Sequence, residues 1–127
     1  MLYQVNATGT IDPRIEMHYR FHQKIDPSQY PQVHDFYEIM LVTDGKMEME
    51  INRETELAGT GALFLIRPGD VHNRKAVGAC SYINLAFPAE VVEKMFRYLD
   101  IPEMKQRILG LPRPPRTKLT AGETLLL

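Results

Sequence analysis

The sequence predicts a mostly β protein, in which an antiparallel barrel or sandwich is followed by two or three α-helices. Residues 1–87 contain short alternating segments separated by turn residues, which is the pattern of closely spaced strands. Residues 88–110 change to helical spacing, and residues 111–127 hold a proline-rich connector and the start of a further helix. A chain of 127 residues is the size of one ordinary domain and can bury a core without a disulfide or a metal.

Composition and charge argue against several classes of protein. The 15 basic residues balance 16 acidic ones, and a net charge of −1 disfavours a nucleic-acid-binding surface on this domain. The single cysteine, Cys80, cannot form an internal disulfide, and residues 1–10 lack the features of a signal peptide. No apolar run approaches about 18 residues, the length of a membrane span. These features predict a cytoplasmic protein with no membrane partner.

Alternation of side chains predicts the strands. Residues 16–23 form the first, and residues 33–42 the clearest, in which His34 and Glu38 point to the same face. The later signals are a hairpin turn at Asp44-Gly45, a strand over 46–52, a turn at Asn52-Arg53, a strand over 54–57, a buried strand over 62–66, a turn at Pro68-Gly69-Asp70 and a strand over 81–87.

Helical spacing begins after Pro88. Apolar residues recur every three or four positions over 89–100, and Pro102 separates this helix from a second one over 103–109. The prolines of residues 111–118 exclude regular helix or central strand and favour an extended connector.

A last helix is predicted at the C-terminus. Thr120 and Glu123 match a capping box, and an apolar run over 125–127 follows. A helix that stops within about two turns of its cap is marginal by itself. We therefore expect that a longer protein was cut here, with a frayed native tail as the alternative.

Two motifs of the β half resemble those of the cupin family. Residues 32–38 (Gln-Val-His-Asp-Phe-Tyr-Glu), followed by Gly45, resemble the first cupin motif, and residues 61–72 (Gly-Ala-Leu-Phe-Leu-Ile-Arg-Pro-Gly-Asp-Val-His) resemble the second. Together with residues 82–88 (Tyr-Ile-Asn-Leu-Ala-Phe-Pro) before a helix, the sequences of these motifs are similar to the ligand-sensing domain of AraC-type transcription regulators. The resemblance covers about residues 15–127.

The resemblance implies a small cupin-like antiparallel jelly-roll barrel over residues 1–87, with residues 1–15 as an N-terminal arm. It implies that a small polar molecule, often a sugar, binds inside the barrel. It also implies a homodimer that forms through the helices of residues 88–110. Such bacterial domains are paired with a C-terminal double helix-turn-helix unit that contacts DNA. These 127 residues contain no such unit, which agrees with the expected cut.

Face alternation and motif position select the candidate site residues. The candidates for ligand binding inside the barrel are Gln32, His34, Phe36, Glu38, Met40, His72, Tyr82 and Asn84. The candidates for the dimer interface on the first helix are Val92, Met95, Phe96 and Leu99.

A divalent metal is the alternative use of three of these residues. His34, Glu38 and His72 match ligand positions of the metal-binding cupins, and two imidazoles with one carboxylate can hold Fe, Mn, Ni or Zn. However, Gln32 occupies the position of the first cupin histidine, and the usual fourth ligand has no histidine here. The resemblance therefore requires no cofactor. The competing interpretation is that these groups hydrogen-bond a neighbour or a bound sugar.

Several other polar residues have simpler interpretations. His18, Arg20 and His22 share one strand face, which we expect to face solvent. Cys80 has no neighbouring motif and is expected to be inert. Arg67 replaces the small residue or proline common at its motif position; we expect an exposed turn arginine, with an anionic ligand as the alternative.

The sequence lacks a nucleophile elbow, a phosphate-binding glycine loop and a Ser-His-Asp order. The first hypothesis is therefore a non-enzymatic effector-binding and dimerisation domain of an AraC-type regulator. The second is a stand-alone metal-dependent cupin enzyme, such as a dioxygenase or a sugar isomerase. The third is a purely structural dimerisation domain whose barrel is packed shut.

Overall fold

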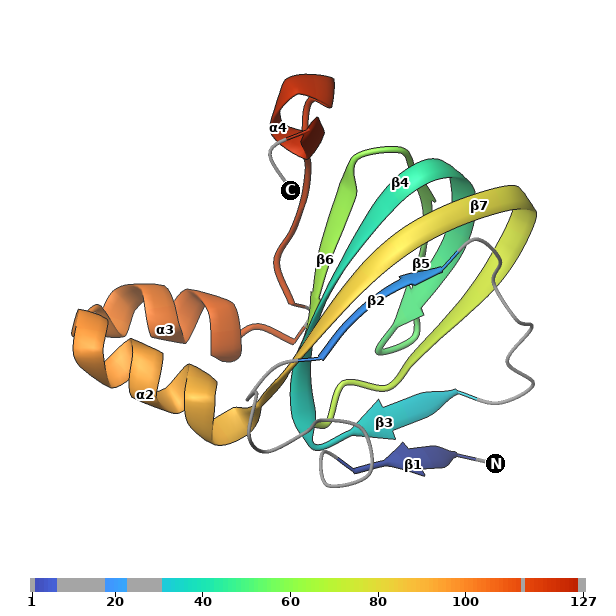
Figure 1. Cartoon of the computed structure of the whole chain (residues 1–127). Coiled ribbons are helices and arrows are strands. Elements are labelled where there is room, and N and C mark those ends of the chain that lie inside the picture. The colour runs from blue at the N-terminus through green and yellow to red at the C-terminus, as the bar shows by residue number, and fades with distance from the viewer. Residues whose placement is uncertain (1, 7–17, 23–30, 113, 126–127) are drawn as a thin grey trace.

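The computed structural model describes residues 2–6, 18–22, 31–112 and 114–125, and strands dominate this part of the chain (Figure 1). The strands are β1 (Tyr3–Val5), β2 (His18–His22), β3 (Gln32–His34), β4 (Phe36–Ile51), β5 (Glu54–Gly59), β6 (Ala62–Ile66), β7 (His72–Pro88) and β8 (Arg116–Lys118). The helices are α2 (Ala89–Leu99), α3 (Pro102–Leu109) and α4 (Ala121–Leu125).

The long strands β4 and β7 pair antiparallel and bend, so each contributes to two layers of one eight-stranded sheet. In one layer, residues 36–42 of β4 lie between β6 and residues 82–88 of β7, with β8 and β2 outside them. In the other layer, residues 47–51 of β4 lie between β5 and residues 72–76 of β7, followed by β3 and β1. The predicted antiparallel jelly-roll barrel is therefore confirmed (Figure 1).

The hairpin turn predicted at Asp44-Gly45 is wrong, because β4 continues through these residues. Val42 pairs with Tyr82 and Asp44 with Ser81, so Thr43 is an extra residue in β4, a β-bulge. The extra residue reverses which positions face inward, from even numbers before the bulge to odd numbers after it. Gly45 permits the bend, because its φ is +82° and a Cβ there would collide with the carbonyl oxygen of Ala79.

The main apolar core lies between the two layers. Alternation along β4 predicted this face correctly on both sides of the bulge, because a period of two is fixed by the pleat. The cluster is rich in methionine, whose flexible side chain fills irregular gaps. It comprises Met40, Val42, Met47, Met49, Ile51, Ala58, Phe64, Ile66, Cys80 and Tyr82.

Helices α2 and α3 project to one side of the barrel (Figure 1). Their predicted positions agree with the structure to within one residue: α2 ends at Leu99 instead of residue 100, and α3 begins at Pro102 instead of residue 103. The capping box before α4 is also confirmed: Thr120 N donates to Glu123 Oε1 at 2.9 Å, and Glu123 N donates to Thr120 Oγ1 at 3.1 Å.

Three predicted segments need correction. The strand predicted over 81–87 is the second half of β7, which begins at His72. Residues 116–118 do not remain a free connector, because they form β8 on the edge of β6. Of the predicted arm, Tyr3–Val5 pairs parallel with β3, so this part belongs to the sheet, and residues 7–15 lie outside the described residues.

Candidate functional site

Three buried polar side chains meet between the layers of the barrel. His34 comes from the end of β3, Glu38 from the first half of β4 and His72 from the start of β7. One potential ligand atom from each residue lies within 4.8 Å of the other two. The expected convergence of these three residues inside a rolled sheet is therefore observed.

The side chains are packed tightly around His34. Its Nε2 lies 3.3 Å from Glu38 Oε2, and its ring stacks on the ring of Phe36 with centroids 4.0 Å apart. The rings of His34 and His72 meet at an angle of 64° with centroids 4.9 Å apart. The His34 imidazole is thus held between an aromatic ring, a carboxylate and a second imidazole.

The Asp70 carbonyl oxygen sets the tautomer of His72. His72 Nδ1 lies 3.1 Å from this oxygen. A carbonyl can only accept, so Nδ1 carries the hydrogen and Nε2 keeps its lone pair for the interior. Burial lowers the pKa of His72 to about 4, so the imidazole is neutral at pH 7.

Glu38 is a carboxylate in spite of its burial. Burial raises its pKa, but the contact with His34 and the positive charge of Arg74 outweigh burial and hold the pKa below its usual value. Arg74 Nη1 lies 3.8 Å from Glu38 Oε1. The interior therefore presents one anion beside a neutral imidazole acceptor and a guanidinium donor.

Several buried polar atoms of this cluster have no hydrogen-bond partner among the described residues. They are both ring nitrogens of His34, Nε2 of His72 and Oε1 of Glu38. His34 Nε2 and Glu38 Oε1 have charged neighbours, Glu38 Oε2 at 3.3 Å and Arg74 Nη1 at 3.8 Å, but neither contact has hydrogen-bond geometry. A buried donor or acceptor without a partner costs about 1–3 kcal/mol, and native proteins rarely leave one unpaired. The cluster is thus built to meet another polar group, which could be a ligand, a metal or water.

Arg74 is a site residue that the sequence pattern did not single out. It follows His72 by two positions on β7 and therefore shares its face. Its guanidinium carbon lies 5.2 Å from the centroid of the Tyr82 ring, in addition to the contact with Glu38. Extending the strand back from residue 81 to His72 would have revealed it.

The other five candidate ligand residues lie on the same interior face. Phe36, Met40 and Tyr82 are buried, and Gln32 and Asn84 are half-buried. Gln32 pairs with His72, Asn84 pairs with Met40, and Tyr82 pairs with Val42. Directly opposite residues of an antiparallel pair share a face, so these predicted residues lie on the interior face, although only His34, Glu38 and His72 form one compact cluster.

The strand β2 pairs antiparallel with β7, and the expectation that His18, Arg20 and His22 face solvent stays a prediction. The Cα partners on β7 are Ala86 for His18, Asn84 for Arg20 and Tyr82 for His22.

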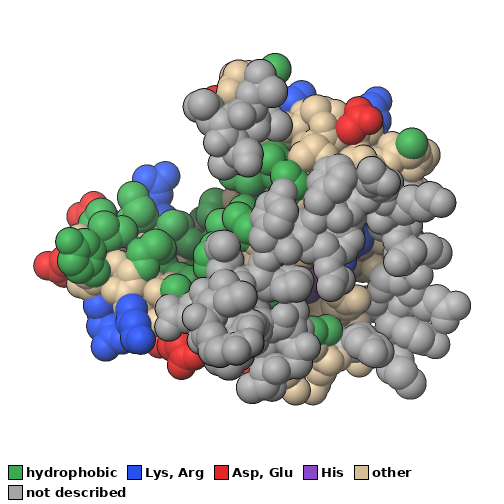
Figure 2. All heavy atoms as spheres, viewed as in Figure 1, with side chains coloured by type: hydrophobic (Ala, Val, Ile, Leu, Met, Phe, Trp, Pro, Cys, Tyr) green, Lys and Arg blue, Asp and Glu red, His purple; other side chains and the backbone are tan. Residues whose placement is uncertain are grey.

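The helical candidates divide into buried and exposed residues. Phe96 is buried within its own chain, so its prediction as a dimer contact is corrected to a core position. Val92 is half-buried, whereas Met95 and Leu99 are 49% and 45% exposed. Figure 2 shows hydrophobic side chains gathered over α2 and α3.

An apolar cavity of about 460 Å³ separates these helices from the outer face of the sheet. The sheet side includes Tyr37, Ile39, Leu65 and Phe87. The helix side includes Val91, Val92, Met95, Phe96 and Ile108. The helices therefore do not fill the space above the sheet by themselves.

The environment of Arg67 also differs from the prediction. Its side chain is buried, not an exposed turn arginine, and it binds Asp70 through a charged hydrogen bond. Because Asp70 already neutralises it, Arg67 is not available to an anionic ligand in this arrangement.

An antiparallel jelly roll with histidines and a glutamate on its interior face defines a cupin. More narrowly, the chain belongs to the AraC-like ligand binding domain family, whose model matches residues 18–123. A comparison with curated proteins finds no match.

Solved cupin structures share the fold. The chain is similar to an ethanolamine utilization protein Q candidate from Salmonella typhimurium LT2, with 24% identity and a TM-score of 0.50 over 58% of this chain and 59% of that one. It is also similar to a cupin-2 domain containing protein from Shewanella frigidimarina NCIMB 400, with 16% identity and a TM-score of 0.50 over 60% and 74% of the two chains. The chain thus spans about three fifths of the Salmonella protein.

Among the described residues, no helix is long and apolar enough to cross a membrane.

Proposed function

We propose that this domain senses a small polar effector that binds between the layers of the barrel and does not react there. The supporting observation is the group of buried polar atoms on His34, Glu38 and His72 that make no hydrogen bond. A bound polar molecule would supply the missing hydrogen bonds, so binding would remove a free-energy cost that the free protein carries.

The proposed location of the domain is the cytoplasm, and the single buried thiol of Cys80 agrees with this location.

A carbohydrate is the proposed class of effector. Glu38 accepts hydrogen bonds, Arg74 donates them, and the neutral His72 presents an acceptor at Nε2. A sugar hydroxyl donates and accepts at once, so it can satisfy such mixed neighbours. The aromatic rings of Phe36 and Tyr82 offer apolar faces at the same site. The proposed contacts also include Gln32, Met40 and Asn84.

The proposed output is a change in how two copies of the domain associate. Met95 and Leu99 expose apolar surface on α2, and Val92 is partly exposed beside them. A ligand that prefers one arrangement of barrel and helices shifts the population toward it. We propose that this shift changes the presentation of a DNA-binding unit with which the domain works.

A thermal-shift panel of mono- and oligosaccharides tests effector binding. A ligand at 100 times its dissociation constant stabilises the protein by about 2.7 kcal/mol. Glu38→Gln is expected to abolish this shift, because it removes the interior anion. Glu50→Gln is the matched control, since Glu50 lies on the same strand but is exposed. No stabilisation by any sugar, or an equal loss in both variants, would contradict the proposal.

A divalent metal at the same cluster is the second candidate. The donor set fits, because His34, Glu38 and His72 bring two imidazoles and a carboxylate together, and His72 is neutral with Nε2 free. A metal bound there would supply Lewis-acid chemistry, as a metal-dependent cupin enzyme requires.

Elemental analysis of the purified protein separates the two candidates. Near-stoichiometric metal that is lost in His72→Ala would favour the metal site and the enzyme. Metal-free protein that binds a sugar would favour the sensor.

A further inference from the structure

Arg67 and Asp70 form a buried ion pair that closes the turn between β6 and β7. Arg67 Nε donates to Asp70 Oδ2 at 3.0 Å, and Arg67 Nη2 donates to Asp70 Oδ1 at 3.1 Å. The backbone nitrogen of Arg67 donates to Asp70 Oδ2 at 2.8 Å. A two-pronged contact of this kind fixes both distance and orientation, which a single point charge would not do.

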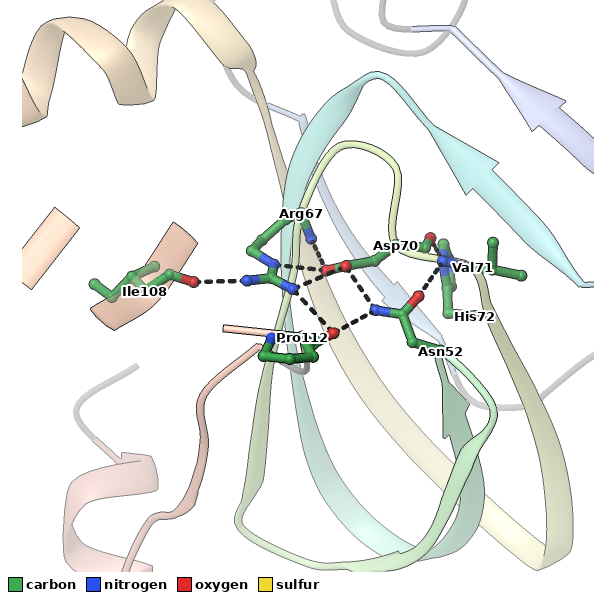
Figure 3. A network of polar contacts seen from close by, with 7 residues as sticks. All are labelled: Asn52, Arg67, Asp70, Val71, His72, Ile108 and Pro112. Atoms are coloured by element: carbon green, nitrogen blue, oxygen red, sulfur yellow. Dashed lines mark hydrogen bonds and ion pairs between the residues drawn. The ribbon is translucent and has the colours of Figure 1, made fainter. Parts of the chain in front are cut away.

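The same guanidinium reaches the end of α3 (Figure 3). Arg67 Nη1 donates to the carbonyl oxygen of Ile108 at 3.0 Å, and Nη2 lies 3.5 Å from the carbonyl oxygen of Pro112. The last carbonyls of a helix have no partner within the helix and carry partial negative charge, so a cation stabilises them. One side chain therefore attaches α3 and the segment after it to the barrel.

Asn52 joins the tip of the β4–β5 hairpin to this network (Figure 3). Its Nδ2 donates to Asp70 Oδ1 at 2.9 Å and to the Pro112 carbonyl oxygen at 3.0 Å. Its Oδ1 accepts from Val71 N at 2.9 Å. The carboxylate of Asp70 thus accepts hydrogen bonds from both Arg67 and Asn52, which connect the turn to the β4–β5 hairpin.

The backbone of the same turn orients the interior site. The carbonyl oxygen of Asp70 accepts from His72 Nδ1 at 3.1 Å, while the carboxylate of Asp70 binds Arg67. A continuous chain of polar contacts therefore runs from the His72 ring through Asp70 and Arg67 to the end of α3.

We propose that Arg67 and Asp70 are positioning residues that couple the His72 side of the interior site to the C-terminal end of α3. This inference rests on the proposed sensor function and adds the route by which the site reaches the helices. Arg67 uses all three of its side-chain nitrogens, and the pair is buried, so the turn and the helix end move together. The helices that expose apolar surface are thereby linked to the effector site.

Hydrogen exchange of the full chain, followed by mass spectrometry, tests the link without any ligand. The substitutions are Arg67→Met, His72→Phe and the two together, and the reporter is the exchange rate of the amides of residues 105–111. His72→Phe keeps a ring and removes the donor to Asp70. Arg107→Met is the matched control, because Arg107 is an exposed arginine in the last turn of α3 itself.

The coupling predicts that Arg67→Met raises the exchange rate of these amides by about tenfold or more, while Arg107→Met changes it by less than about twofold. His72→Phe is expected to raise the rate as well, and the double variant to exchange no faster than Arg67→Met alone. If Arg67 has only a structural role, the fold-increases in exchange rate of the two single variants should multiply in the double variant, because independent changes add in free energy. If Arg67→Met does not fold, Arg67→Lys replaces it in the same comparison. Lysine keeps the positive charge but loses the two-pronged contact of the guanidinium with Asp70.

Two results would overturn the coupling: an unchanged rate in the Arg67 variant, or single effects that multiply in the double variant. These results are independent of effector binding. A sugar panel that stabilises neither wild type nor any variant would contradict the proposed function and leave the coupling standing.

Discussion

Glu38 and Arg74 meet across the barrel interior, with Arg74 Nη1 3.8 Å from Glu38 Oε1. Glu38 belongs to the layer formed by the first half of β4, and Arg74 to the layer formed by the first half of β7. The contact therefore joins the two layers beside the histidines. It also helps to keep the buried glutamate ionised, because the contact with His34 and, after it, the guanidinium of Arg74 lower the pKa of Glu38 against the opposing effect of burial.

Removing this guanidinium should weaken both the fold and the site. Arg74→Met leaves Glu38 with less compensation for its burial, and we expect a loss of about 1–2 kcal/mol in the free energy of unfolding. The pKa of Glu38 should rise in the variant. Urea unfolding at pH 7 measures the first effect, and Arg53→Met, at an exposed turn residue, is the control. Equal stability of the two variants would contradict the role of Arg74.

Acid should destabilise the protein before ordinary carboxylates titrate. The pKa of His72 is about 4 in the fold and about 6.5 when unfolded, so the unfolded state binds more protons between these values. Stability is then complete above about pH 6.5 and falls toward pH 4, by as much as roughly 1.4 kcal/mol per pH unit. Glu38, whose pKa is also lowered, adds to the loss at lower pH.

Urea unfolding at several pH values measures this slope. In His72→Phe the part of the slope between about pH 6.5 and pH 4 should disappear, because no imidazole remains to titrate at this position. A slope that persists unchanged in the variant would mean that other groups cause it.

The bend of β4 should depend on Gly45. Gly45→Ala places a Cβ against the carbonyl oxygen of Ala79 at a φ of +82°, so we expect a loss of about 1–3 kcal/mol. Gly59→Ala is the control, since a Cβ there meets nothing within 4 Å. Thermal unfolding of both variants makes the comparison, and similar melting temperatures would argue against a strained bulge.

Association of two copies should depend on the exposed side of α2. Leu99→Glu places a charge where the proposed interface is apolar, and we expect it to convert a dimer to a monomer. Lys94→Glu, an exposed position of the same helix, should leave the dimer intact. Light scattering coupled to size-exclusion chromatography measures the mass. A wild-type monomer at high concentration would contradict the proposed dimer.

The alternation of side chains in the sequence was sufficient to predict which strand residues face the interior. Met47, Met49 and Ile51 fall inside as predicted, and so do His34 and Glu38, because the pleat alone sets which side a residue takes. The capping box at Thr120 was equally local, since both of its hydrogen bonds span three residues.

Features set by distant pairing could not be predicted in this way. Asp44-Gly45 has the composition of a hairpin turn. However, β4 remains paired with β7 through these two residues, and the irregularity is a bulge at Thr43. Arg67 sits in a turn, which favours exposure, yet Ile108 and Pro112 lie over it from residues more than 40 positions away. Arg74 was missed because the polar start of β7 lacks the apolar alternation that identifies a strand.

The account depends most on a polar ligand that binds between the layers of the barrel. NMR of protein labelled only at histidine, titrated with the sugar that gives the largest thermal shift, tests this directly. We expect the ring signals of His34 and His72 to move with a saturable dependence on sugar concentration, and Glu38→Gln to abolish the movement. Saturable sugar binding that leaves both rings unchanged, or a panel in which no sugar binds, would contradict the account.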